Sequence, residues 1–124
     1  MEIKNAIIKS TTLGIEDHGI MTFYLGLNYG CIYQSAGGYS LDTPIKKDGV
    51  FLKRIGTAFG MCLIIEVLRV VGANDWENLK GKHIRVKADS TSVYAIGNII
   101  TDDWLDFKTF YENIKESIAL IEEE

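Results

Sequence analysis

The chain has 124 residues, of which 47% are apolar and 24% charged, and its formal net charge is −4. This length fits one domain with a modest core, so we expect residues 1–124 to form a single domain. The negative charge argues against general affinity for nucleic acids, which requires many phosphates to be neutralised. Two cysteines are too few for a disulfide scaffold, and we expect both to be reduced.

Charge is distributed unevenly along the chain. Residues 102–124 contain eight acidic and two basic side chains, a net charge of −6, whereas residues 1–101 contain nine acidic and eleven basic ones, a net charge of +2. The longer part is therefore able to hold an anion. The most apolar run, residues 58–71, includes Glu66 and Arg69 and is too short to cross a bilayer. Since no signal-peptide pattern precedes it, we expect a cytosolic protein with no membrane partner.

Three strands are predicted in the first 41 residues. The first covers residues 2–12 and is followed by a turn over residues 14–19, which contain two glycines. The second covers residues 21–29, where apolar side chains occupy every other position. The third covers residues 31–41 and includes a Gly-Gly pair. The alternation in the second strand predicts one buried face and one face that meets a ligand or water.

The middle of the chain predicts a loop and then a helix. Residues 42–53 contain the only proline and have no clear period, which favours a loop. The helix is expected from Thr57 to about Val71, with Gly72 in the C-cap position. It is apolar on nearly every side, as expected of a helix that is central to the core or pressed against a partner subunit.

The last third of the chain predicts a hairpin and a second helix. Ile84, Val86 and Ala88 alternate with His83, Arg85 and Lys87 in a strand over residues 82–88. A turn follows at residues 89–91, and residues 93–100 pair back as a strand. Residues 106–121 have apolar residues at helical spacing. The order βββ-α-ββ-α indicates an α+β fold with a largely antiparallel sheet and two main helices.

Residue patterns for catalysis are sparse. His18 and His83 match no metal-ligand spacing, and no Walker or dinucleotide fingerprint is present. Cys62 lies inside the apolar helix and is interpreted as a core residue. Asp102 and Asp103 are interpreted as helix-entry caps rather than a catalytic carboxylate pair. We therefore predict a non-enzymatic protein with no catalytic residue, no metal and no cofactor.

Two features favour anion binding. Residues 54–60 precede and open the apolar helix, whose N-terminal N–H groups attract anions, and Arg54 is able to contact a phosphate through two nitrogens. The equally weighted alternative is an N-cap at Thr57 with glycines that permit close packing. Residues 80–87 form a basic run that faces phosphates or, alternatively, forms a charged, solvated edge strand.

A third feature favours a nucleotide. Residues 26–30 and 33–39 mix glycine with aromatic and amide side chains, which stack on bases and bond to their edges. The alternative is that the glycines mark bulges and the tyrosines are half-buried sheet residues.

The candidate ligand-binding residues are drawn from all three features and from the polar residues that follow them. They are Tyr24, Asn28, Gln34, Gly37, Gly38, Tyr39, Arg54, Gly56, Thr57, Phe59, Lys82, His83, Arg85, Asn98, Asp103 and Trp104. Phosphate contacts are expected from Arg54, Lys82 and Arg85. Stacking or wall contacts are expected from Tyr24, Tyr39, Phe59 and Trp104. Base-edge or ribose contacts are expected from Asn28, Gln34, Thr57, Asn98 and Asp103.

Four collinear blocks stand out in the sequence: IIKSTTLGIEDHGI at 7–20, YQ at 33–34 with GGYSLD at 37–42, WENLKGKHIRV at 76–86, and AIGN at 95–98 followed by Trp104. Together these blocks resemble the first-described family of phage Thoeris anti-defence (Tad) proteins. The blocks cover nearly the whole chain.

The resemblance implies a sponge that binds a cyclic ADP-ribose immune signal, made by a bacterial TIR-domain enzyme, without cleaving it. It further implies a homo-oligomer with ligand sites between subunits in the cytoplasm of the infected host cell, and in some members a separate site for cyclic oligonucleotides. Two alternatives stay open: an enzyme that degrades the signal, and an inhibitor that binds an effector protein directly. Binding to single-stranded nucleic acid is a weaker third, and no specific nucleic-acid partner is expected.

Overall fold

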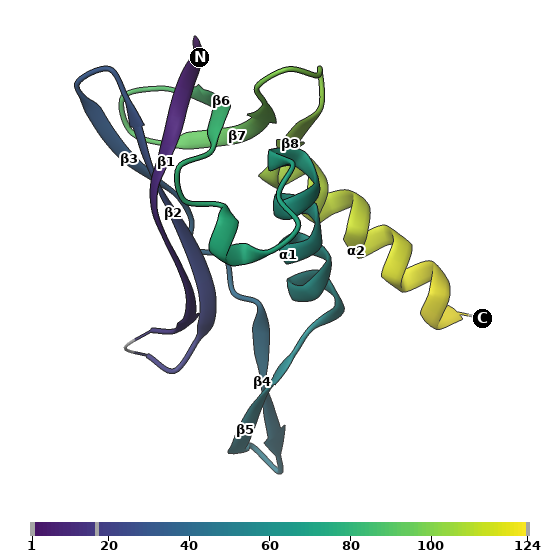
Figure 1. The fold of residues 1–124 in the computed structure, drawn as a ribbon. Coiled ribbons are helices and arrows are strands. Elements are labelled where there is room, and N and C mark those ends of the chain that lie inside the picture. The colour runs from purple at the N-terminus through teal and green to yellow at the C-terminus, as the bar shows by residue number, and fades with distance from the viewer. Residues whose placement is uncertain (1, 17, 124) are drawn as a thin grey trace.

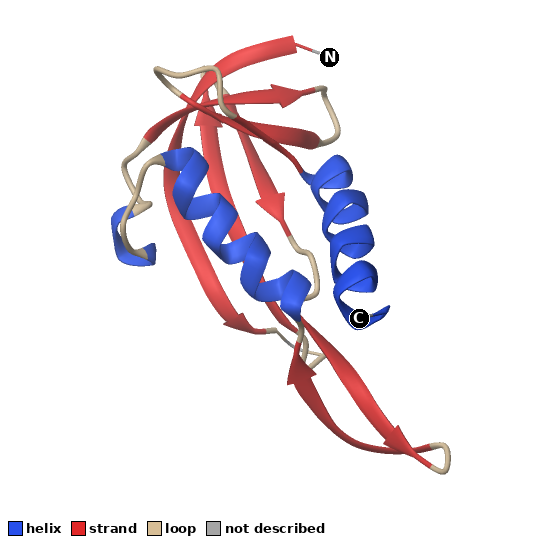
Figure 2. Cartoon of the chain, turned by 90° about the vertical axis from the view of Figure 1, so that its right-hand side faces the viewer, coloured by secondary structure: helices blue, strands red, loops and turns tan. Residues whose placement is uncertain are grey.

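A six-stranded antiparallel sheet forms the body of the protein and wraps around one helix (Figures 1 and 2). The computed structural model describes residues 2–16 and 18–123, with side chains up to residue 115. Within them the strand order of the sheet is β3-β2-β1-β6-β7-β8, and a separate two-stranded hairpin is formed by β4 and β5. The α+β class, the antiparallel sheet and the two helices confirm the sequence prediction.

The first three strands are β1 (Glu2–Ile15), β2 (Met21–Tyr29) and β3 (Ile32–Gly37). The bounds of β2 are those predicted, and the three central side chains of its inner face, Phe23, Leu25 and Leu27, are completely buried. β1 runs three residues further than predicted. β3 ends four residues earlier than predicted, because Gly37 and Gly38 adopt φ values of 112° and 84° that turn the chain out of the strand.

The loop predicted at residues 42–53 is wrong. This segment forms β4 (Asp42–Lys47) and β5 (Val50–Gly56), a hairpin that projects away from the body (Figures 1 and 2). Asp48 and Gly49 connect the strands with φ values of 51° and 78°. Two consecutive positive φ values define a type I′ turn, for which Asp-Gly is a preferred pair. That dipeptide was the signal for the hairpin in the sequence.

Helix α1 (Ala58–Val71) confirms the predicted helix and both of its caps. Thr57 Oγ1 accepts a hydrogen bond from the backbone N–H of Gly60 (2.9 Å), and Gly72 closes the helix with φ 86°. One side of α1, including Leu63, Val67 and Val70, is buried against the sheet.

The rest of the chain contains a short 3-10 helix η1 (Trp76–Asn78), the strands β6 (His83–Ala88), β7 (Val93–Asn98) and β8 (Trp104–Asp106), and helix α2 (Phe107–Glu123). The β6–β7 hairpin was predicted, whereas β8 was not. The capping role predicted for Asp102 and Asp103 is wrong, because Asp106 Oδ1 accepts the hydrogen bond from the N–H of Thr109 in the first turn of α2 (3.0 Å). In the described part of the chain no helix is long and apolar enough to span a membrane.

The curvature of the sheet brings its two ends toward each other. Gln34 on β3 donates from Nε2 to the carbonyl of Asp89, in the turn between β6 and β7 (3.2 Å). β3 does not pair with β7, however, because β3 is an edge strand and β7 pairs with β6 and β8. The space between them is a groove, which we call the β3–β7 groove.

Candidate functional site

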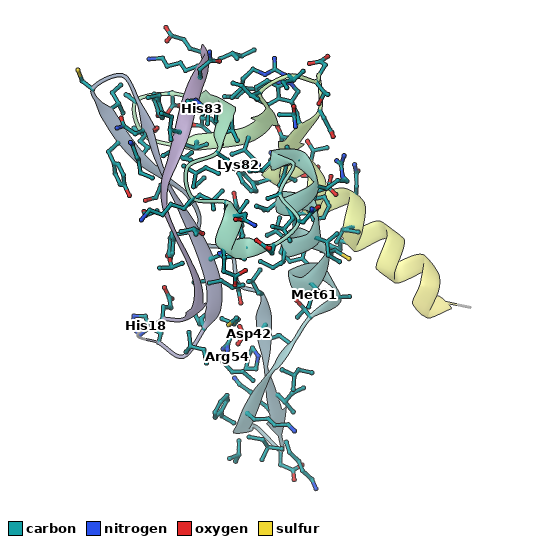
Figure 3. The ribbon with its side chains drawn as sticks, in the orientation of Figure 1. His18, Asp42, Arg54, Met61, Lys82 and His83 are labelled. Carbon is teal, nitrogen blue, oxygen red and sulfur yellow. The ribbon has the colours of Figure 1, made fainter. Side chains whose placement is uncertain are left out.

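The start of α1, the first predicted anion site, is used by the fold itself. Arg54 donates from Nε and from one terminal nitrogen to the two carboxylate oxygens of Asp42, both at 2.9 Å, at the root of the hairpin (Figure 3). This pairing lowers the pKa of Asp42 to about 2. Thr57 Oγ1 donates to the carbonyl of Leu41 (3.2 Å) besides capping the helix. Arg54 and Thr57 therefore already have partners within the chain.

The glycines and the aromatic residue at the same helix start also make packing contacts. A Cβ on Gly60 would lie 2.2 Å from the carbonyl oxygen of Leu41, so only glycine permits this approach. Phe59 contacts Phe110 and Tyr111 of α2, with ring centroids 6.1 and 5.2 Å away. Gly56 has open space around it and lines a small apolar cavity. These contacts favour the N-cap and packing interpretation over an anion site.

Arg85 on β6 is likewise engaged within the protein. Its Nε donates to the carbonyl of Asn98 (2.8 Å) and one terminal nitrogen donates to that of Thr101 (2.7 Å). The guanidinium lies 4.6 Å from the ring centroid of Trp104, and the ammonium of Lys87 lies 4.4 Å from it. The cluster holds the β7–β8 connection against the sheet.

Trp104 covers a glycine of the neighbouring strand. A Cβ on Gly97 would lie 2.6 Å from the indole ring, so the ring rests directly on the backbone of β7. Cross-strand pairing places Asn5, Arg85, Gly97 and Trp104 in one row across four strands. The row lies on the outer face of the sheet, away from α1.

The next row on the outer face of the sheet contains two more of the predicted ligand-binding residues, Asn28 and His83. Asn28, Ile7 and His83 are paired across β2, β1 and β6, and Lys82 precedes His83 at the start of β6 (Figure 3). His83 is exposed and Lys82 is half-buried. Tyr24 lies two residues from Gly26 on the same face of β2 and is 39% exposed. These residues share a face with Arg85.

Three predicted polar residues have structural partners. Asn98 donates from Nδ2 to the carbonyl of Val70 at the end of α1 (3.0 Å) and accepts from two backbone N–H groups of the following turn. Asp103 pairs with Arg69 of α1. Gln34 accepts a hydrogen bond from the Tyr29 hydroxyl and donates to Asp89. Each contact joins two elements of the fold.

The β3–β7 groove is a cavity of the described residues that combines aromatic, hydroxyl and ammonium side chains in one lining. It has a volume of about 490 Å³ and lies between the edge of β3, the β6–β7 turn, the first half of β7 and the start of α2. The lining residues are Ser35, Gly37, Tyr39, Thr91, Ser92, Val93, Tyr94, Asp106, Phe107 and Lys108. Two of the predicted residues, Gly37 and Tyr39, are among them, whereas the other fourteen lie elsewhere. Gly38 is adjacent, and its N–H donates to the carbonyl of Phe23 (2.7 Å).

Tyr39 provides an aromatic wall of the groove. Its ring stacks on Phe107, with centroids 5.1 Å apart and an interplanar angle of 27°. Burial and the nearby carboxylate of Asp106 raise the pKa of the Tyr39 hydroxyl. Gly37 is needed beside it, because a Cβ there would lie 2.4 Å from the carbonyl oxygen of Phe23.

A hydroxyl-rich turn forms the opposite wall. Asp89 Oδ1 accepts from the N–H and hydroxyl of Thr91 (both 2.8 Å) and from the N–H of Ser92 (2.9 Å), while Oδ2 accepts from the Tyr94 hydroxyl (2.6 Å). These bonds hold the pKa of Asp89 well below its usual range. The turn is thus fixed in place by one carboxylate, and its hydroxyl groups are preorganised along the groove.

Lys108 adds an ammonium group to the groove at the first turn of α2. Sequence reasoning missed Lys108 and the Thr91–Tyr94 segment as site residues. The Ser90-Thr91-Ser92 run after Asp89 was the available signal for the hydroxyl-rich wall. Nothing in the sequence placed that run opposite Tyr39, because the two are 52 positions apart.

Among the described residues no group of three or more histidine, cysteine or acidic side chains gathers into a metal-binding arrangement. Comparison of the chain with protein-family models, with curated proteins and with solved structures found no match.

Proposed function

We propose that this protein binds a nucleotide-like small molecule in the β3–β7 groove and releases it unchanged. The observation that carries the proposal is the pairing of an aromatic wall, Tyr39 stacked on the buried Phe107, with a fixed row of hydroxyls in a groove of about 490 Å³. Sites for small molecules typically have volumes of about 300–1,000 Å³ and combine apolar walls with a few placed polar groups.

Each part of a nucleotide has a counterpart in the groove. A base stacks on the ring of Tyr39, which Phe107 supports from behind. Ribose hydroxyls and base edges bond to the hydroxyls of Ser92 and the neighbouring turn residues. The ammonium of Lys108 attracts a phosphate.

The family resemblance supplies the identity of the ligand within this proposal. The ligand is a cyclic ADP-ribose immune signal, and the protein acts as a sponge that keeps the signal from its effector in the cytoplasm of an infected bacterium. The lining supports retention without turnover, because the described residues of the groove include no histidine or cysteine, and its one carboxylate, Asp106, caps α2. A homo-oligomer whose second subunit helps to enclose the ligand is part of the proposal.

The test is calorimetric titration of the full chain with purified cyclic ADP-ribose isomers, followed by heat denaturation and chromatography of the released ligand. We expect saturable binding and recovery of the intact compound. Recovery of a converted product would replace the sponge with a degrading enzyme. Absence of binding at micromolar concentrations would favour an inhibitor that binds a protein.

Two matched variants locate the site. Tyr39→Leu keeps an apolar contact with Phe107 but removes the aromatic face, and should abolish most of the binding. Tyr33→Leu removes a tyrosine that is 59% exposed on the outer face of the sheet and bonds to Ser10, and should leave binding unchanged. Equal losses in the two variants would place the site outside the groove.

A further inference from the structure

One wall of the β3–β7 groove is organised by a single carboxylate. Thr91 and Tyr94 both line the groove, and both donate their hydroxyl hydrogens to Asp89, Thr91 to Oδ1 (2.8 Å) and Tyr94 to Oδ2 (2.6 Å). A hydroxyl has one hydrogen and two lone pairs. Because each hydrogen is already bonded to Asp89, only the oxygen lone pairs of the two hydroxyls are left for a ligand.

The direction of these two bonds follows from the charge of Asp89, since an ionised carboxylate accepts hydrogen bonds and has none to donate. The bonds also favour ionisation. The Tyr94 hydroxyl first, and then the N–H and hydroxyl of Thr91, hold the pKa of Asp89 well below its usual range. The bond to Asp89 in turn raises the pKa of the Tyr94 hydroxyl. Both hydroxyls are thus donors within the cluster and acceptors toward the groove.

The backbone around Asp89 keeps the carboxylate turned toward the two hydroxyls. Its Oδ1 also accepts from the backbone N–H groups of Thr91 and Ser92 (2.8 and 2.9 Å). The N–H of Asp89 donates to the carbonyl of Ser92 (3.0 Å), and the carbonyl of Asp89 accepts from Gln34 Nε2 on β3 (3.2 Å). The acceptors are therefore held in place before a ligand arrives, which lowers the cost of ordering them on binding.

Groups that are able to donate to a ligand lie in other parts of the lining. Lys108 has an ammonium group, which only donates, and the hydroxyls of Ser35 and Ser92 are able to donate or accept. The groove therefore combines a pair of acceptors at Thr91 and Tyr94 with a cation at Lys108.

We propose that the Thr91–Tyr94 wall selects ligands by their hydrogen-bond donors. It takes a group with two neighbouring donors, as a ribose diol or a base amino group offers, and rejects a phosphate or carboxylate. An anionic oxygen there would face lone pairs with lone pairs and leave both sides without a partner. The anionic part of the ligand then meets Lys108. The inference rests on the proposed function, because it requires a ligand in the β3–β7 groove, and it adds which part of the ligand meets which wall.

The experiment is calorimetric titration of the full chain with a cyclic ADP-ribose isomer and with analogues that each lack one donor. In one set a ribose hydroxyl is replaced by fluorine, which is of similar size but has no hydrogen. In another the amino group of the adenine is replaced by hydrogen. One of these changes should weaken binding about tenfold, as loss of a hydrogen bond to a fixed acceptor does. The analogue that shows the loss identifies the group on the wall as ribose or base.

Two variants test whether the wall itself makes this distinction. In Asp89→Asn the amide nitrogen is able to donate to the Tyr94 oxygen, which frees the Tyr94 hydrogen for the ligand. Tyr94→Phe removes one acceptor outright. In both variants the ratio of the affinities for the parent compound and for the weakened analogue should fall from about ten toward one. Tyr33→Phe also removes a bonded hydroxyl, 2.9 Å from Ser10 on the outer face, and should keep the wild-type ratio.

The affinity ratio separates selection from a structural role. If Asp89 only stabilised the turn, its replacement would weaken the parent compound and the analogue by the same factor. Because Tyr94 is 38% exposed, Tyr94→Phe should fold as the wild type does and gives the ratio even where Asp89→Asn fails to fold. A ratio near one for every analogue in the wild type, or an unchanged ratio in both variants, would overturn the inference and leave the proposed function standing. Absence of binding of any isomer to the wild type would overturn both.

Discussion

The start of α1 and the β3–β7 groove have similar compositions but opposite roles in the structure. Both combine glycine, hydroxyl and aromatic residues next to a cation. At the start of α1, Arg54 is bonded to Asp42, and Thr57 is bonded to Gly60 and Leu41. In the groove, the ring of Tyr39 and the ammonium of Lys108 border open space. The helix start therefore uses its polar groups within the chain, whereas the groove presents an aromatic ring and an ammonium group beside hydroxyls that Asp89 holds in place.

The start of α1 and the β3–β7 groove differ because different parts of the chain lie next to their polar groups. The start of α1 is pressed against the chain that leads into it, so its donors find carbonyl and carboxylate groups nearby. The groove forms where two strands of a curved sheet approach without pairing, so its walls have no backbone partner across the gap. A gap of this kind leaves hydroxyl and aromatic groups facing solvent, and a ligand is able to replace that solvent.

The largest expected effect tests the structural role of the helix start. Gly60→Ala places a methyl group against the carbonyl of Leu41, at a position where a Cβ would be 2.2 Å from the oxygen. We expect the free energy of unfolding to fall by more than about 2 kcal/mol, although alanine favours helices by about 1 kcal/mol. Urea denaturation of the variant and the wild type measures this change in the free energy of unfolding. An increase in stability would show that Gly60 and Leu41 do not pack closely.

The second effect tests the groove. Tyr39→Leu should weaken ligand binding by roughly 10- to 100-fold, the loss expected when one base-stacking ring is removed. The unfolding midpoint should change little, because leucine still packs on Phe107. Calorimetry and urea denaturation on the same sample give both values. If Tyr39→Leu lowered the unfolding midpoint and the ligand affinity together, Tyr39 would have a structural role like that of the residues at the start of α1.

The third effect depends on pH. Asp42 has its pKa lowered to about 2 in the folded protein, below the value of about 4 in an unfolded chain. Its contribution to stability is therefore present above pH 4 and is lost as the pH falls toward 2. Arg54→Gln should lower the unfolding midpoint at pH 6, by less than Gly60→Ala does, and the difference from wild type should shrink at pH 2.

Arg54→Gln also tests whether the start of α1 takes part in ligand binding. If the helix start is structural, affinity measured by calorimetry at pH 7 should equal that of the wild type. A loss as large as that of Tyr39→Leu would mean that Arg54 leaves Asp42 to contact the ligand, and the two regions would then form one site.

The smallest effect concerns the cation in the groove. Lys108→Gln should weaken ligand binding about threefold at low salt, because an exposed charge contributes modestly and is screened. The difference from wild type should vanish near 0.5 M salt. Lys115→Gln serves as the matched control, because Lys115 lies about two helical turns further along α2. Ligand binding by this variant should equal that of the wild type at every salt concentration.

The fold follows from local patterns in most places, and the exceptions have identifiable causes. The alternation in residues 21–29 and 82–88 and the Thr57 and Gly72 caps of α1 each depend on neighbours in the chain, and each was predicted. The β4–β5 hairpin was missed although Asp48-Gly49 is a turn signal, because its strands bury no face and so leave no alternation. β8 was missed because three residues are too few to show a period.

The residue types that suit a ligand can be read from the sequence: the Gly37–Tyr39 stretch, the basic strand and the hydroxyl-rich turn are all visible in it. Tertiary contacts then determine which of these side chains the fold bonds internally and which line a groove. The pairing of Arg54 with Asp42 and the bonds of Arg85 to two carbonyls join residues 12 to 16 positions apart, and Tyr39 lines the same groove as Thr91, which is 52 positions away. Local periodicity carries no information about such distances, because they are set by how the sheet curves around α1.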